Sequence, residues 1–504
     1  MRHSWYTGLF RCVFLRKRRS YMETMEPQET QEQHENKGVA ATLIETTIET
    51  KATHRNKAYD AADVRQFTER NSDIDYKILL ALYEHRALTS AQLKRGWFPH
   101  LHENSIRNRL KTLAERRVLT VNVKAGIKTS PVKLYSLSAF GLRILTENVL
   151  EVMEYVPQYD EKKEHYTIDD LKVRSQHNHH YELQEWVMNI RAKRPELFHC
   201  EWKRFPFVEE EEDTVRVKPD WLFLEADEAT KERTKQNVAN NPLLYPYFYR
   251  KDAFPDISLQ PILCVECDRG NMSRTELVDK WEGYKKLPES YKPKAISVFY
   301  TPKKAGDMRH RMIRDTLSHA FELEVIQNHI QLFQGDPQLT HDISMLYFER
   351  DKELLRGEEM IDEEQFTTLF KGYVESSNVG EASILDVDKT IERFKLPVQP
   401  DAIIMKQQES PILQIVFYGM YGWVNPIIKI QAIKRWLKEG HLSMFSEIQY
   451  ILIYPNDSFY QDVRTMDDDI FYVSYEEIKG SGKWGKARHE QRKHRQVKWV
   501  EVLL

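Results

Sequence analysis

The sequence predicts an α+β protein with several domains. Three helical periods followed by two alternating strands come first, helices and apolar strands alternate next, and a third segment repeats that order in weaker form. A chain of 504 residues has room for about three domains of the usual size. Its hydrophobic content of 41% is enough to fill their cores.

Composition narrows the class of protein. The formal net charge of −3 gives no overall attraction to a polyanion, so local clusters must decide whether the chain binds one. Four cysteines are too few for a disulfide framework, and Cys264 and Cys267 lie in an apolar strand as expected core residues. No apolar stretch approaches the ~18–20 residues of a membrane span. We expect a cytoplasmic protein with no membrane partner.

Changes in composition set the expected domain boundaries. Residues 1–65 are polar and lack an apolar period, which predicts a disordered tail. The segments that follow are a helical domain ending in a hairpin at 70–150, an α/β domain at 176–330, a degenerate repeat of it at 340–478 and a basic tail at 479–504.

The domain at 70–150 has the element order of a winged helix-turn-helix. Thr89 and Gln92 form a capping-box pattern at the start of its second helix. Its third helix starts near Glu103, with Ile106, Leu110 and Leu113 as the inner stripe. Two alternating strands, 118–125 and 132–138, then form the wing.

Local charge predicts that this domain binds double-stranded DNA. Residues 103–133 hold eight Lys and Arg against two Glu, and a basic helix fits the major groove. The candidate DNA-binding residues are Asn104, Arg107, Asn108 and Lys111 on the helix and Lys124 and Lys128 on the wing. The alternative is a protein-binding module whose basic face is only solvated.

The segment at 176–330 resembles the PD-(D/E)XK nuclease fold. Lys218-Pro219-Asp220 precedes one strand, and Glu266 lies in the strand that reads CVECD. The resemblance implies that these two carboxylates hold a divalent metal, Mg²⁺ if the site is active, and act with a nearby lysine. The usual lysine position holds Asp268, so Lys280 or Arg274 on the next helix is the expected substitute.

Other residues leave the activity of this segment open. The alternative interpretation is an inactive fold in which Asp268-Arg269-Gly270 is a strand-to-helix turn fixed by an Asp–Arg pair. Glu182 or Glu185 on the opening helix is a candidate additional acid. The cluster of His177, His179 and His180 is interpreted as a helix cap and surface feature rather than a metal site.

The segment at 340–478 aligns with the preceding one in four elements. The alignment sets Asp401 at the position of Asp220, Val416 at that of Glu266 and Tyr418 at that of Asp268, with Gln414 as the nearest polar group. One carboxylate is a poor metal site. This predicts a catalytically inactive repeat that serves packing, dimerisation or contact with the DNA backbone.

Several motifs together resemble the bacterial plasmid replication-relaxation family over about residues 70–325. They are SAQLKRGWF, ENSIRNRLKTLAERRVL, the helix at His180, the Lys-Pro-Asp motif and E-x-D-R-G before a basic helix. The resemblance implies a DNA-binding protein of a plasmid or other mobile element that acts in replication, DNA relaxation or its regulation. Two alternatives stay open: a metal-dependent nuclease or nickase targeted by the winged helix, and a non-catalytic scaffold of a replication complex. Binding to replication proteins and homodimer formation are further open points.

Overall fold

The computed structural model describes residues 72–124, 132–148, 167–173, 177–195, 197–201, 217–232, 259–287, 289–301, 308–349, 368, 382–407, 411–438, 445–455, 470–481, 486–493 and 496–503. Helices and three sheets make up these residues, two sheets mixed and one antiparallel, which confirms the α+β class. The expected tail at 1–65 lies outside them. None of the described helices is long and apolar enough to cross a membrane.

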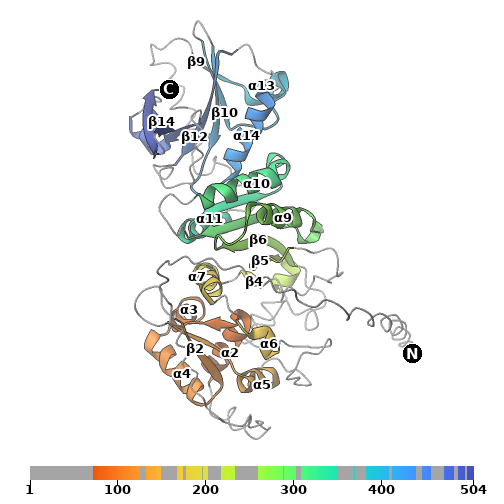
Figure 1. Cartoon of the computed structure of the whole chain (residues 1–504), viewed down its shortest axis with the longest axis vertical. Helices are drawn as coiled ribbons and strands as arrows, with labels where there is room; N and C mark the ends of the chain where they lie inside the picture. Colours follow the sequence, from red (N-terminus) through yellow and green to blue (C-terminus); the bar gives the residue numbers. More distant parts are fainter. Residues whose placement is uncertain are drawn as a thin grey trace, which may run out of the picture. The chain divides into compact units, whose positions relative to one another are not determined.

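The first described part, residues 72–148, is called the head (Figure 1). Its elements are α2 (Asp73–His85), β1 (Ala87–Leu88), α3 (Ser90–Gly96), α4 (Glu103–Glu115), β2 (Leu119–Lys124), β3 (Val132–Leu137) and α5 (Ala139–Asn148). The three strands form an antiparallel sheet in the order β1-β3-β2. The head therefore has the three helices and the hairpin that the sequence predicts, and α5 follows them as a fourth helix.

Local signals in the sequence explain the helices of the head. The Thr89 hydroxyl accepts a hydrogen bond from the Gln92 amide, and the Gln92 side chain accepts one from the Thr89 amide, which is the predicted capping box. On α4, Ile106, Leu110 and Leu113 are all buried, as the helical period predicts. The opposite face of α4 is left to solvent.

The second described part, residues 177–349, is called the central unit. Its elements are α7 (His177–Lys193), β4 (Phe198–Cys200), β5 (Trp221–Ala226), β6 (Leu259–Asp268), α9 (Arg274–Lys285), β7 (Ala295–Tyr300), α10 (Arg309–Ile326), β8 (Gln331–Gly335) and α11 (Pro337–Glu349). A short helix, α6 (Ile168–Leu171), precedes it, and a 3₁₀ turn (Glu289–Tyr291) follows α9. The sheet order is β4-β5-β6-β7-β8, and only the last three strands are parallel to one another.

Helices cover both faces of the central sheet. Leu277 and Trp281 of α9 pack with Leu317 of α10 against one face, where Cys264 lies. Trp186 of α7 belongs to the core on the other face. Strand β8 extends the sheet to Gly335, past the boundary expected at 330, and α11 follows it. This strand is short and begins only a few residues after α10, with Asn328 in the left-handed conformation between them.

The third described part, residues 382–503, is called the C-terminal unit. Its elements are β9 (Ala382–Leu385), α13 (Val387–Phe394), β10 (Ala402–Lys406), β11 (Ile412–Tyr418), α14 (Asn425–Leu437), β12 (Glu447–Tyr454), β13 (Ile470–Ser474), α15 (Tyr475–Ser481), β14 (Lys486–Lys493) and β15 (Gln496–Leu503). They build one seven-stranded sheet. The segment expected as a basic tail thus contains a β-hairpin that pairs with β13.

The C-terminal unit repeats the topology of the central unit strand by strand. In both, two antiparallel pairings are followed by two parallel ones, so that β4 to β8 correspond to β9 to β13. Helix α14 joins β11 to β12 as α9 joins β6 to β7. The sequence repeat therefore corresponds to a repeated fold, with the β14-β15 hairpin as an addition.

The two repeats are joined along the edge of the central sheet. The Gln334 amide of β8 donates to the Gly422 carbonyl (2.8 Å), and the Val424 amide donates to the Leu332 carbonyl (3.0 Å). The Asn425 side chain accepts from the Leu332 amide and donates to the Ile330 carbonyl. Residues of the C-terminal unit therefore pair with β8, which would otherwise present open backbone groups.

Candidate functional site

The exposed face of α4 carries all four of its predicted DNA-binding residues. Asn104, Arg107, Asn108 and Lys111 are exposed. Arg107 forms an ion pair with Glu103 (2.7 Å) while its side chain stays 58% exposed, and Lys111 lies 3.8 Å from Glu115 with 74% exposure. Such exposed i,i+4 pairs contribute only ~0.3–0.5 kcal/mol, so both cations can turn toward a phosphate at low cost.

Of the other cations near this face, one contacts α2 and one lies outside the described residues. Arg109 points back to α2, where it contacts the Asp75 carboxylate (2.9 Å) and the Ser72 hydroxyl (2.8 Å). Lys124 is the last residue of β2, and Lys128 lies outside the described residues. The structure therefore describes the side chains of the four helix residues, but not those of Lys124 and Lys128 on the wing.

A second group of polar residues gathers at the ends of β5 and β6. Asp220 directly precedes β5, and its Oδ2 accepts a hydrogen bond from the Cys267 amide (2.9 Å). The same oxygen lies 3.1 Å from Nε2 of His179 on α7. His179 was expected to be a surface feature, yet its side chain is only 19% exposed. Its contact with Asp220 spans 41 residues of sequence, so no local pattern could have indicated it.

Glu266 is the buried centre of this group. Its side chain is 2% exposed, with Lys280 of α9 donating to Oε2 and the Tyr284 hydroxyl donating to Oε1. Lys280 is the lysine expected to replace the missing one, and the structure brings it onto Glu266. Arg274, the other candidate, is exposed in the first turn of α9. Tyr284, one helical turn after Lys280, was not among the predicted residues.

Burial and charge set the protonation of the group. Burial raises the pKa of Glu266 to about 7, against the lowering effect of Lys280. Burial also favours the neutral form of Asp220, but the hydrogen bond and charge of His179, together with the Lys280 charge and the Cys267 amide, lower the pKa of Asp220 overall. Burial opposes charge on Lys280 too, yet Glu266 and Asp220 raise its pKa overall. Near neutral pH, Asp220 and Lys280 are therefore charged, and Glu266 is present in both its protonated and its ionised form.

The carboxylate of Asp268 does not join this group. Arg309 of α10 binds it with two nitrogens, at 2.5 and 2.6 Å, and both side chains are almost fully buried. A bidentate pair of this kind fixes geometry. The Asp–Arg pair expected for the inactive fold therefore exists, but with Arg309 in place of the neighbouring Arg269.

The acidic candidates on α7 have separate positions. Glu185 forms an ion pair with Arg95 of the head (2.8 Å). Glu182 is half-buried and lies close enough to help burial and Asp220 raise the pKa of the Cys267 thiol. Cys267 itself is buried, like Cys264, in line with the expected core cysteines. Of the two acids, Glu182 is the one near the Asp220 group.

The fit of this group to a divalent metal is partial. Two carboxylates are suitable donors for a hard cation such as Mg²⁺, and both contacts described for Asp220 fall on Oδ2. Both oxygens of Glu266 are engaged, so metal binding would have to displace Lys280 or Tyr284 from one of them. Among the described residues, no cluster of three or more His, Cys, Asp or Glu side chains is arranged to hold a metal.

The C-terminal unit keeps one carboxylate of the pair. Oδ2 of Asp401 accepts a hydrogen bond from the Tyr418 amide (2.7 Å), as that of Asp220 does from Cys267. Tyr418 therefore corresponds to Cys267, and Phe417, rather than Val416, takes the position of Glu266.

A β-bulge explains why the sequence alignment is wrong by one residue. In β6, Phe223 pairs with Leu263 and Leu224 with Pro261, so Ile262 is an extra residue that β11 lacks. Either alignment puts an apolar residue at the position of Glu266. Gln414, the nearest polar group in the sequence, is buried and donates to the Gln449 side chain (2.8 Å).

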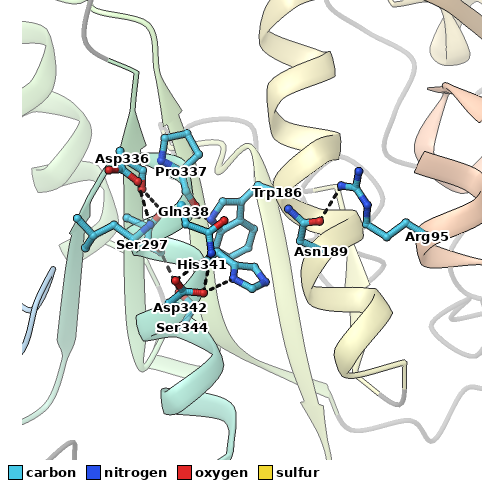
Figure 2. Close-up of polar contacts among 12 residues, drawn as sticks. Arg95, Trp186, Asn189, Ser297, Asp336, Pro337, Gln338, His341, Asp342 and Ser344 are labelled. Atoms are coloured by element: carbon cyan, nitrogen blue, oxygen red, sulfur yellow. Dashed lines mark hydrogen bonds and ion pairs between the residues drawn. The ribbon is translucent and has the colours of Figure 1, made fainter. Parts of the chain in front are cut away.

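Helix α7 connects the head to the Asp220 group. On one side of α7, Arg95 from α3 contacts Asn189 (2.6 Å; Figure 2). Arg95 also forms the ion pair with Glu185. On the other side, the Trp186 indole donates to Thr340 of α11 (3.1 Å) beside His341. A single hydrophobic core contains residues of both the head and the central unit. The helix that carries His179 is therefore packed between the two.

The comparisons with known proteins identify one family. No curated protein and no solved structure matches the chain. A family model described as replication-relaxation matches residues 79–298, which include α3, α4, α7, Asp220, Glu266 and Lys280. These are the segments whose motifs carried the resemblance. Over residues 79–298 the chain therefore matches the replication-relaxation family, as its sequence motifs predict.

Proposed function

We propose that this chain is a DNA-binding protein of a plasmid or other mobile element, acting in replication, DNA relaxation or its regulation. The observation that carries the proposal is the exposed face of α4, where Arg107 and Lys111 lie beside Asn104 and Asn108. The head has the element order of a winged helix-turn-helix, in which the helix before the hairpin enters the major groove. The family match supports the replication theme.

Residue types on α4 fit both parts of DNA recognition. Arginine and lysine neutralise phosphates and contact guanine edges, and asparagine pairs with adenine. Titrating fluorescent duplex DNA with the full chain, without metal, tests the proposal. Saturable binding that weakens as salt rises is the expected result. A chain that leaves duplex anisotropy unchanged at every protein concentration would refute the proposal.

One observation favours a second function, metal-dependent DNA nicking. Lys280 is held on Glu266, close enough to Asp220 to affect its pKa, although position 268 lacks the usual lysine of the PD-(D/E)XK pattern. We propose that Asp220 and Glu266 hold Mg²⁺ and that Lys280 orients water or stabilises charge on the phosphate. Mg²⁺ would supply the activation of that water. His179 would keep Asp220 ionised and in position.

Supercoiled plasmid distinguishes the two functions. Purified protein is incubated with it at low salt, with Mg²⁺, with Mn²⁺ and with EDTA. Open circles that appear only with metal, and that Asp220→Asn removes, would establish nicking. If the plasmid stays supercoiled under all conditions, the second function is refuted while binding by the head is not. Protein capture without binding or nicking would instead point to the scaffold alternative.

A further inference from the structure

We propose that a small organic anion of mononucleotide size binds in a cavity at the joint between the head and the central unit. The cavity lies where the end of α3 and the turn after it meet the end of α7. Six of its lining residues are Arg95, Trp97, His100, Arg191, Ala192 and Pro195. It is separate from the Asp220 group, and the proposal does not depend on that group being active.

The charge of the cavity selects anions. Arg95 and Arg191 both line it, and none of its described lining residues is acidic. Arg95 is paired with Glu185 of α7 (2.8 Å), so the positive charge at the cavity comes chiefly from Arg191. Arg191 is 7% exposed, donates to the Gly96 carbonyl (3.0 Å) and lies 2.9 Å from His199. Burial and the neighbouring Arg191 lower the pKa of His199, so that histidine adds no charge. A guanidinium this deeply buried beside a cavity is a strong local source of positive potential.

The size and the apolar lining of the cavity favour a ligand that carries a planar group as well as a negative charge. A volume of about 480 Å³ falls in the range of about 300–1,000 Å³ found for small-molecule sites. Trp97 stacks against the Arg191 guanidinium at 4.1 Å, and its buried indole nitrogen has no hydrogen-bond acceptor among the described residues. Pro99 and Pro195 add rigid apolar surface. A base or another aromatic ring joined to a phosphate fits this combination.

The cavity lies between two helices, so a bound ligand would affect how they are held together. Gly96 and Trp97 end α3, and the cavity includes Pro99 and His100 of the turn that leads into α4. Arg191 and Ala192 belong to α7, which holds Asp220 through His179. A ligand that contacts both elements stabilises the joint between them, by an amount that grows as the ligand concentration rises above its Kd.

Calorimetric titration of the full chain with AMP tests the proposal, with adenosine and inorganic phosphate as separate probes. Ala192→Glu introduces a carboxylate at the cavity, and Ala192→Gln is its neutral control. Ala192 is exposed, so both variants should fold like the original protein.

We expect AMP to bind more tightly than either fragment, and Ala192→Glu to weaken AMP at least about tenfold relative to Ala192→Gln. Absence of AMP binding in the millimolar range overturns the proposal, as does equal affinity of the two variants. Phosphate binding as tightly as AMP would overturn the part of the proposal that concerns the planar group.

Discussion

Replacing both Arg107 and Lys111 with alanine should weaken duplex DNA binding and make it less sensitive to salt. Each cation that neutralises a phosphate contributes about −0.9 to the slope of log affinity against log salt. Losing both contacts should therefore reduce the slope by about 1.8. Between 50 and 200 mM salt, one contact changes the affinity about 3.5-fold and two change it about 12-fold. A fluorescence anisotropy titration readily resolves a difference between these two salt dependences.

The structure supplies a matched control on the same helix. Arg109 has the same charge as Arg107 but contacts Asp75 and Ser72 of α2. Arg109→Ala should lower the free energy of unfolding by about 1 kcal/mol and leave the salt slope within error. The double variant should unfold nearly as the original does, because its ion pairs are exposed. An unchanged slope in the double variant, or an equal loss in Arg109→Ala, would refute this account of α4.

Three further predictions concern the central unit and its joint with the head. If plasmid nicking is found, Lys280→Ala should abolish it, whereas Lys285→Ala and Asp401→Asn should not; nicking that survives Lys280→Ala would exclude Lys280 from the chemistry. Because burial raises the pKa of Glu266 to about 7, a proton on this carboxylate competes with the metal below that pH. The Mg²⁺ affinity measured by calorimetry should therefore fall about tenfold per pH unit below 7 and level off above 8. An affinity that stays constant from pH 6 to 8 would contradict the raised pKa of Glu266. Gly96→Ala would place a Cβ 2.4 Å from Sδ of Met188, which is fully buried, so thermal unfolding should show a loss of about 1–2 kcal/mol, and an unchanged Tm would mean that the joint is looser than described.

The elements predicted well are those whose signals are local. The capping box at Thr89 and the stripe of Ile106, Leu110 and Leu113 depend only on spacing within one helix, and both are present. The contact of Lys280 with Glu266 was anticipated through the resemblance to the nuclease fold, which put a substitute lysine on the helix after the strand.

The features that were missed depend on contacts between distant residues or on local irregularities. His179 meets Asp220 across 41 residues, and Arg95 meets Asn189 across 94, so neither partner is visible from its own surroundings. The bulge at Ile262 changes the pairing register without changing the hydrophobic pattern, which is why the repeat was aligned one residue away. Asp268 is similar: its partner, Arg309, comes from a helix 41 residues later.

The central claim is that the exposed face of α4 contacts DNA, and photo-crosslinking tests it most directly. A photoreactive amino acid is placed at Asn108, which is exposed on α4, and in a separate variant at Asp388, which is exposed on α13. Each full-length variant is irradiated with labelled duplex DNA at low salt. The account predicts a strong protein–DNA adduct from position 108 and little from position 388. Equal yields from both positions, or an adduct from position 388 alone, would contradict it.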